Sequence, residues 1–348
     1  MDWRERIEQS LKLLPEQWRA EKLEFQLLHG DASYRRYVRI SGFPVRNTLV
    51  AMLMAPEQAR FSEEAMSGPP PEELPFINIQ RYLKQLGLPV PEIIAQDTQR
   101  AVLFLEDLGD TTLARALAGC CAERLRAYYR QAVELLVEMQ LRCSRQPSPD
   151  CVAYHRAFAQ DLLLWELHHF REYLLEAGRG IVLKGEERAE LDGIFERLAG
   201  EIAAWPRIFV HRDFQSRNLM LTPRGYVLID FQDALLGPQV YDLVALLRDS
   251  YVQLAPELVE ELLDYYAALC RSRGLECPPQ LKEKFYLMSL QRKLKDAGRF
   301  VFIEKVKHNP SFLPFIPASL GYVRTALERL PQLENLRHLL ARYVPELA

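Results

Sequence analysis

Residues 209–221 run F-V-H-R-D-F-Q-S-R-N-L-M-L, and this stretch carries the strongest information about the fold. Its two apolar ends enclose a polar loop, a pattern typical of strand, loop and strand. The segment T-P-R-G and a second apolar run, Y-V-L-I-D, follow it, which predicts a short β hairpin. Asp213 and Asn218 therefore lie in the loop before the hairpin, and Asp230 ends its second strand.

Asp213, Asn218 and Asp230 supply the kinds of oxygen atom that phosphoryl transfer requires. A carboxylate orients the attacking hydroxyl and accepts its proton, and hard oxygen ligands hold magnesium on the phosphates. The spacing predicts Asp213 as the catalytic base and Asn218 and Asp230 as Mg²⁺ ligands, which pairing of the hairpin strands could bring close together. A lone aspartate at a strand end is more commonly a turn or capping residue, so the prediction depends on the whole set.

Composition excludes several classes of protein. The chain has 348 residues, a formal net charge of -3 and six cysteines, without a C-x-x-C pair. So small a net charge gives no global field to attract nucleic acid or an anionic membrane. No apolar run approaches the ~20 residues of a membrane span, and the mixed charges of residues 1–14 are unlike a signal peptide. We expect a cytoplasmic protein with reduced thiols and no nucleic-acid or membrane partner; the oligomeric state is unknown at this stage.

The chain length favours two lobes, because one hydrophobic core seldom extends over so many residues. Three strand-like runs, a helical pattern and a further strand-like run occupy residues 22–28, 34–40, 48–54, 76–86 and 101–110. Long amphipathic helical patterns dominate the remainder of the chain. We predict a β-rich N-lobe at residues 1–105, a hinge at 106–110 and a mostly helical C-lobe at 111–348.

The spacing H-R-D-x-x-x-x-N from His211 to Asn218 is that of the protein-kinase catalytic loop. The region from Ile208 to Tyr251 resembles the aminoglycoside phosphotransferase and choline kinase superfamily. The strings H-R-D-F-Q-S-R-N-L-M and I-D-F-Q-D-A-L-L-G-P-Q-V-Y-D-L, with L-Q-R-K-L-K-D-A-G near Leu290, resemble bacterial anomeric kinases of N-acetylmuramate and N-acetylglucosamine. Gln215 departs from that group, whose loop often carries histidine at this position.

This resemblance implies an α+β, bilobal protein-kinase-like fold and an enzyme that uses ATP and Mg²⁺. The implied reaction is phosphorylation of a small-molecule sugar, at the C1 hydroxyl of N-acetylmuramate or N-acetylglucosamine, in cell-wall sugar recycling. Two alternatives are a kinase for another acceptor, such as an aminoglycoside, choline or homoserine, and a nucleotide-binding pseudokinase. The pseudokinase is suggested by residues 48–54, which lack the lysine that pairs with phosphates in protein kinases.

Two segments are candidates for binding the nucleotide through backbone groups. The turn H-G-D-A-S lies where this fold has its phosphate-covering loop, with Gly30 and Ser33 as candidate contacts. An ordinary polar hairpin turn is the alternative. The hinge run L-E-D-L resembles the adenine-binding segment of the family, which implies nucleotide contacts at Glu106 and Leu108.

Some other residue must replace the positive charge of the missing strand lysine. We hypothesise that Arg35 or Arg36, beside the phosphate loop, supplies it, with Arg81 on the following helix as a third candidate. Arginine suits this role because its planar guanidinium can donate two hydrogen bonds to phosphate. A solvated strand face is the alternative for each arginine.

The resemblance also implies that His211 and Asp242 support the catalytic loop, with Asp242 hydrogen-bonded back to it. A carboxylate in the first turn of a helix is equally favoured by capping and by the helix dipole, so that alternative stays open. His211 is interpreted as a packed scaffold residue, not as a proton carrier.

On the acceptor side, the resemblance implies contacts from Arg217, Asp249, Arg292 and Lys295. Arg292, Lys295 and Arg299 recur at i, i+3 and i+7, which brings them to one helix face. One interpretation is an anion pocket that would suit the lactyl carboxylate of N-acetylmuramate. The alternative is a basic helix face in contact with solvent.

Overall fold

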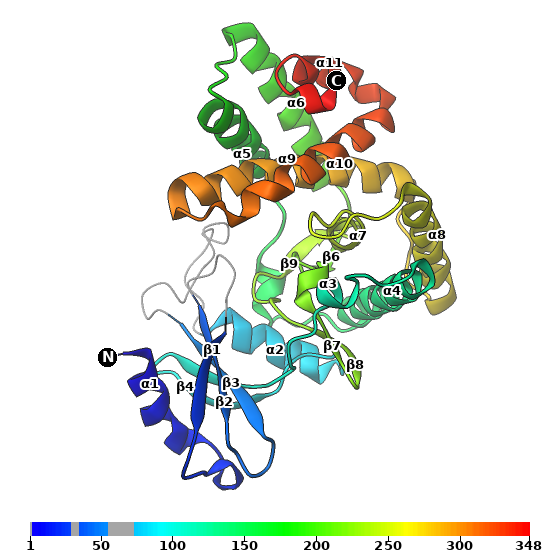
Figure 1. The fold of residues 1–348 in the computed structure, drawn as a ribbon. Coiled ribbons are helices and arrows are strands. Elements are labelled where there is room, and N and C mark those ends of the chain that lie inside the picture. The colour runs from blue at the N-terminus through cyan, green and yellow to red at the C-terminus, as the bar shows by residue number, and fades with distance from the viewer. Residues whose placement is uncertain (1, 29–34, 55–72) are drawn as a thin grey trace. The chain divides into compact units, whose positions relative to one another are not determined.

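The computed structural model describes residues 2–28, 35–54 and 73–348, and the chain divides into two units. Unit 1 contains residues 1–112 and 219–232, and unit 2 contains residues 113–218 and 233–348. The helices and strands of unit 1 are α1 (Trp3–Ser10), β1 (Glu24–Leu28), β2 (Arg36–Ser41), β3 (Thr48–Leu53), α2 (Pro75–Gln85), β4 (Ile93–Asp97), β5 (Val102–Glu106), β7 (Leu219–Thr222) and β8 (Gly225–Leu228) (Figure 1).

An antiparallel sheet with strand order β1-β2-β3-β5-β4 forms the centre of unit 1. Val38 and Ile40 of β2 lie opposite Ala51 and Leu49 of β3, and all four side chains are buried in one hydrophobic cluster with residues of α1. Alternate residues of a strand point to opposite faces, so Arg39 points away from this cluster. The first three strands agree with the predicted runs, whereas the short, partly polar β4 is not predicted.

The hairpin of β7 and β8 belongs to unit 1, although it follows the catalytic loop in sequence and was predicted within the helical lobe. Direct contacts join the hairpin and the residues that follow it to other segments of unit 1. The backbone N–H of Leu221 donates to the carbonyl of Thr111 at 2.7 Å, and the ring of Phe231 stacks on Phe76 of α2 at 4.9 Å between centroids. These contacts explain why the hairpin groups with the sheet.

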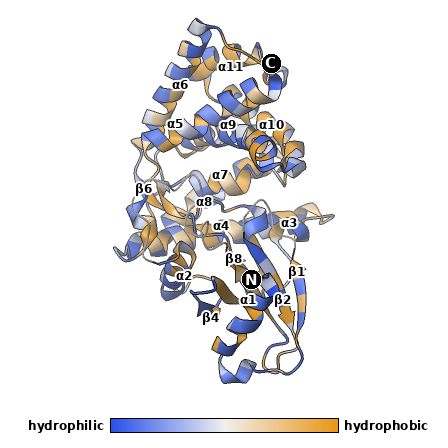
Figure 2. Cartoon of the chain, turned by 90° about the vertical axis from the view of Figure 1, so that its left-hand side faces the viewer, coloured by the Kyte–Doolittle hydropathy of each residue, from blue (hydrophilic) through white to orange (hydrophobic). Residues whose placement is uncertain are grey.

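Unit 2 is mostly helical. Its elements are α3 (Leu113–Ala116), α4 (Ala122–Arg145), α5 (Gln160–His169), α6 (Gly185–Ala203), β6 (Arg207–Val210), β9 (Leu235–Pro238), α7 (Tyr241–Leu247), α8 (Pro256–Arg273), α9 (Leu281–Lys307), α10 (Ile316–Glu328) and α11 (Glu334–Ala341). A π-helix, Phe170–Gly178, continues α5, and β6 pairs with β9. Every residue of helix α7 is buried, and its colour in Figure 2 is mostly hydrophobic. Within the described ranges, no helix has the length and apolarity needed to cross a membrane.

Helix α9 is unusual because every residue from Phe285 to Gly298 is buried. A helix covered on all sides is ordinarily hydrophobic all round. This one nevertheless carries Arg292, Lys293 and Asp296 in its buried stretch. Its charged residues therefore do not form the solvated basic face that was one interpretation of the sequence.

A close helix crossing fixes α9 against the end of α5. Gly298 faces the backbone of His169 so tightly that a Cβ atom at position 298 would overlap the His169 carbonyl group. Only glycine provides that clearance. Helix α9 also supplies Arg292, which donates hydrogen bonds to the predicted catalytic loop.

We expect Gly298→Ala to lower the free energy of unfolding by about 1–3 kcal/mol, because the added methyl group meets backbone atoms that cannot rotate away. Gly321→Ala in α10 is the matched control, since nothing lies within 4 Å of a Cβ at that position. Alanine there should stabilise by about 0.5–1 kcal/mol through helix propensity. Chemical denaturation of both variants measures the difference, and a stabilising Gly298→Ala would contradict the crossing geometry.

Candidate active site

The loop after β6 has an uncommon backbone conformation that a buried carboxylate maintains. Arg212 has a φ of +77°, in the left-handed region that non-glycine residues seldom adopt. Asp242, at the start of α7, accepts hydrogen bonds from the backbone N–H groups of His211 at 2.7 Å and Arg212 at 2.9 Å. This is the contact that the resemblance implies for Asp242. Burial raises the pKa of Asp242 to about 7, although the two N–H donors act in the opposite direction.

His211 has a fully buried side chain, and its ring packs edge-on against Phe214 with 5.8 Å between centroids. Its surroundings are those of a scaffold residue in the core.

Asp213 is the partly exposed carboxylate of this loop, with 37% of its side-chain surface accessible. Nη2 of Arg292 donates to Oδ1 of Asp213 at 3.1 Å, and Nη1 of Arg292 donates to the carbonyl oxygen of Arg212 at 2.8 Å. The side-chain nitrogen of Asn218 donates to the carbonyl oxygen of Asp213 at 2.9 Å. The amide nitrogen of Asn218 is thus used inside the loop, which turns the amide oxygen away from it.

A second buried carboxylate, Asp249, holds the far end of the loop. It accepts hydrogen bonds from the backbone N–H of Ser216 at 2.8 Å, from the Ser216 hydroxyl, and from the N–H of Tyr251 at 3.0 Å. Its side chain has no exposed surface. These surroundings are those of a loop tether, and the substrate contact that the resemblance implies for Asp249 stays a prediction.

The other acceptor-side candidates have different surroundings. The guanidinium of Arg217 lies over the ring of Tyr251, 3.6 Å from its centroid. Lys295 retains 10% of its side-chain surface, and its Nζ lies 3.5 Å from Asp296. Arg292 retains 1% and contacts the catalytic loop. The predicted basic stripe therefore separates into residues with distinct neighbours.

Buried charges connect α9 with α5 and with the loop. Glu166 of α5 accepts hydrogen bonds from the side chains of Arg212 at 3.3 Å and Gln291 at 2.8 Å. Two residues after Gln291 in α9, Lys293 pairs with Asp296 at 2.7 Å. Burial works against ionisation of Asp296, yet the neighbouring cations, Lys293 foremost, hold its pKa well below the ordinary value. Buried charges of this kind persist only when paired.

Within unit 1, Asp230 follows β8 and, like Arg212, has a positive φ, +66°. Nη1 of Arg35 lies 3.6 Å from Oδ1 of Asp230, and the side-chain amide of Gln232 donates to the same oxygen at 2.7 Å. Burial raises the pKa of Tyr37, whose hydroxyl is also hydrogen-bonded to Arg35. A guanidinium, a phenol and a carboxylate therefore share one polar cluster.

The remaining candidates for the missing positive charge lie elsewhere. Arg36 is exposed at the start of β2, and Arg81 pairs with Glu73 at 2.6 Å. Gly30 and Ser33 of the predicted phosphate loop lie outside the described residues. Arg35 is thus the candidate arginine with a structural link to a predicted metal ligand.

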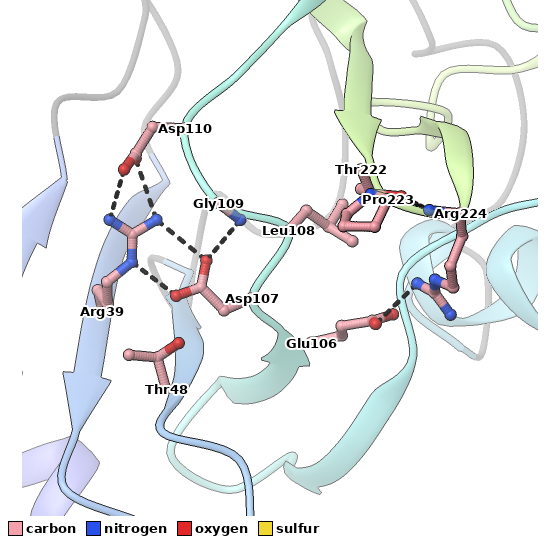
Figure 3. A pocket seen from close by; sticks show the side chains of 10 residues that line it. All are labelled: Arg39, Thr48, Glu106, Asp107, Leu108, Gly109, Asp110, Thr222, Pro223 and Arg224. Atoms are coloured by element: carbon pink, nitrogen blue, oxygen red, sulfur yellow. Dashed lines mark hydrogen bonds and ion pairs between the residues drawn. The ribbon is translucent and has the colours of Figure 1, made fainter.

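A pocket of about 540 Å³ lies at the predicted hinge, entirely within unit 1 (Figure 3). It is lined by Arg39, Thr48, Glu106, Asp107, Leu108, Gly109, Asp110, Thr222, Pro223 and Arg224. The guanidinium of Arg39 lies between Asp107 and Asp110 and donates to both, with the shortest contact, 2.6 Å, to Asp107. This ion cluster fixes the hinge to β2, and no local pattern in the sequence predicts it.

Glu106 and Leu108 have different roles within this pocket. The carboxylate of Glu106 accepts a hydrogen bond from Arg224 at 2.7 Å, and its backbone N–H donates to Glu92 at 2.9 Å. In the part of the chain that the structure describes, the backbone groups of Leu108 make no hydrogen bond. Leu108 can therefore offer a backbone donor and acceptor to a ligand, whereas Glu106 is engaged within the protein.

Each predicted metal ligand is an oxygen donor, a kind of ligand that suits magnesium better than zinc. Among the described residues, no group of three His, Cys, Asp or Glu side chains could hold a metal ion. Asn218 of unit 2 offers an amide oxygen and Asp230 of unit 1 offers a carboxylate oxygen, and each is a kind of oxygen that Mg²⁺ accepts as a ligand. The orientation of the Asn218 amide, with its nitrogen bound at 2.9 Å to Asp213, is consistent with an oxygen ligand.

The model of the phosphotransferase enzyme family, APH, matches residues 53–279. The chain belongs to this family and is a small-molecule kinase; members of the family use ATP. It is 33% identical over 317 residues to the N-acetylmuramate/N-acetylglucosamine kinase of Pseudomonas aeruginosa, a match that covers 90% of this chain and 86% of that protein.

Two solved structures have the same fold. Choline kinase from Cryptosporidium parvum has a TM-score of 0.64 at 12% identity, over 96% of this chain and 97% of that one. ADP-bound aminoglycoside phosphotransferase APH(2'')-Ib has a TM-score of 0.60 at 15% identity, over 92% and 98%. The predicted α+β, protein-kinase-like fold is confirmed.

We expect Asp242→Asn to lower the free energy of unfolding by about 1–3 kcal/mol, because the amide nitrogen would face a backbone N–H donor where a carboxylate oxygen now accepts. Asp264→Asn on α8 is the matched control, since this carboxylate is 69% exposed and pairs with Lys282 at the surface. Its effect should stay within about 0.5 kcal/mol. Urea denaturation compares them, and equal effects would show that the Asp242 hydrogen bonds contribute little.

Proposed function

We propose that this kinase transfers the γ-phosphate of ATP to the anomeric C1 hydroxyl of N-acetylmuramate, N-acetylglucosamine or both. The chemistry is supported chiefly by one observation: a loop held by Asp242 and Asp249 leaves Asp213 as its partly exposed carboxylate. The choice of acceptor is supported by the Pseudomonas aeruginosa relative, which carries that activity in its name and matches 90% of the chain.

In the proposed reaction, Asp213 orients the C1 hydroxyl and accepts its proton. The hydroxyl oxygen forms a bond to the γ-phosphorus while the bond from that phosphorus to the bridging oxygen of ADP breaks. Asn218 and Asp230 are the proposed Mg²⁺ ligands, through their amide and carboxylate oxygens. Bound Mg²⁺ would neutralise charge on the phosphate oxygens.

The nucleotide is proposed to bind at the hinge and beside Arg35. Leu108 supplies backbone groups for the adenine, because these groups make no hydrogen bond within the described protein and Leu108 lines the 540 Å³ pocket. Arg35 takes the place of the missing strand lysine. Its position 3.6 Å from Asp230 supports this assignment, since a metal ligand and a phosphate-binding cation act on the same phosphate groups.

Arg217 and Lys295 are the proposed acceptor contacts. Arg217 lies in the catalytic loop with its guanidinium on Tyr251, and Lys295 retains some exposed surface on α9. Other small acceptors, such as an aminoglycoside, choline or homoserine, are alternatives that the same assay separates.

Wild-type protein incubated with Mg²⁺ and ATP should convert one or both sugars to the 1-phosphate, identified by ³¹P and ¹³C NMR. Asp213→Asn should lower kcat by about 10²-fold or more, because the general base is lost while the side chain keeps its shape. The methyl glycoside of N-acetylglucosamine, whose C1 oxygen is blocked, should yield no product. Phosphorylation of that glycoside, or of choline or kanamycin alone, would refute the proposed acceptor.

Arg35→Ala should raise KM for ATP about tenfold or more, because a charged hydrogen bond to phosphate contributes about 1.5–3 kcal/mol. Arg36→Ala examines the competing hypothesis and should change KM far less, since its side chain is exposed on β2. Arg19→Ala, at a side chain 75% exposed in the same unit, is the control. A larger effect from Arg36 than from Arg35 would reverse the assignment.

A further inference from the structure

We propose that Arg292 of α9 is a positioning residue for Asp213, and that it acts on the catalytic loop instead of binding the acceptor. The inference rests on the proposed function in one respect, the role of Asp213 as the proton acceptor. It assigns to Arg292 a task different from the anion-pocket role suggested by its spacing in the sequence.

The geometry of one guanidinium carries this assignment. Its Nη1 donates to the carbonyl oxygen of Arg212 at 2.8 Å and its Nη2 donates to Oδ1 of Asp213 at 3.1 Å. Because the guanidinium is planar and rigid, these two bonds fix the carboxylate relative to the backbone that precedes it. Asp213 keeps 37% of its side-chain surface accessible, so a hydroxyl can still approach the carboxylate.

Arg292 is itself held in place by a rigid environment. Its guanidinium lies over the ring of Tyr241, 4.7 Å from the centroid, and only 1% of its side chain is exposed. The preceding residue, Gln291, bonds to Glu166, which also pairs with Arg212. Arg292 therefore contacts the backbone of Arg212 directly, and Gln291 reaches the side chain of Arg212 through Glu166. A functional carboxylate supported by such a second layer keeps a single productive orientation.

The same observations argue against direct acceptor binding by Arg292. A residue that recognises a substrate carboxylate must present donors at an accessible surface, but only 1% of the Arg292 side chain is exposed and each of its terminal nitrogens donates to the loop. Removing Arg292 should therefore affect the chemical step for every acceptor alike. An anion pocket would instead discriminate between the anionic N-acetylmuramate and the neutral N-acetylglucosamine.

The test measures kcat and KM for both sugars in Arg292→Met and Arg292→Lys. Arg292→Met should lower kcat by about 10²-fold, by the same factor for both sugars, because a misplaced carboxylate loses its alignment. KM for either sugar should change by less than about threefold. Arg292→Lys keeps a cation that can donate to one of the two oxygens, so its kcat should lie between those of Met and wild type.

Arg171→Met is the matched control, because Arg171 is also buried in unit 2 and pairs with carboxylates, including Glu172 at 3.2 Å, but lies outside the proposed catalytic groups. It should lose stability and retain kcat. Thermal unfolding of all variants separates loss of folding from loss of chemistry, and if Arg292→Met does not fold, Arg292→Lys carries the comparison.

Two results would overturn the proposal: an unchanged kcat in the folded Arg292 variants, or a rise in KM confined to N-acetylmuramate. Failure of the proposed function is recognised separately, because wild type would then phosphorylate neither sugar. In that event the Arg292 variants are compared in ATP hydrolysis, with Asp213→Asn as the reference. A loss of hydrolysis matching that of Asp213→Asn would support the positioning role, and undiminished hydrolysis would refute it.

Discussion

The proposed catalytic loop, from His211 to Asn218, depends on the left-handed backbone of Arg212. A non-glycine residue in this region costs of the order of 1–3 kcal/mol, so the surrounding structure must impose it. Three helices do so: Asp242 of α7 accepts its N–H, Arg292 of α9 donates to its carbonyl, and Glu166 of α5 pairs with its side chain. With its own backbone fixed on both sides, Arg212 sets the direction in which the next residue, Asp213, projects.

The same arrangement explains why unit 2 buries so many charges. Ionised groups lose hydration when buried, and this loss is offset only by close partners. Lys293 and Asp296 pair within α9, and Asp249 is surrounded by donors from the far end of the loop. The helix crossing at Gly298 then determines how close α9 comes to its neighbours. The close packing at Gly298 and the pairing of buried charges such as Lys293 and Asp296 thus both fix the position of α9 in unit 2.

Short-range sequence patterns predicted the features that depend on residues close together in the chain. Strand alternation located β1 to β3, helical periodicity located the long helices, and the spacing of Asp213 and Asn218 indicated the chemistry. Contacts between distant segments left no such pattern. Arg39 and Asp107 are 68 residues apart, and Arg292 and Asp213 are 79 apart, so neither pair could be inferred from spacing. The basic residues of α9 misled for this reason, because helical spacing cannot distinguish a solvated face from a buried one.

Stability alone does not account for the charged interior of α9. A buried ion pair is commonly no more stabilising than well-packed hydrophobic residues of the same volume, so an apolar helix could fill this position equally well. An apolar helix could not donate two directed hydrogen bonds to the loop, as Arg292 does to Arg212 and Asp213. The buried charge of Arg292 is therefore best explained by orientation of Asp213, the proposed catalytic carboxylate, with stability as a secondary consequence of its pairing.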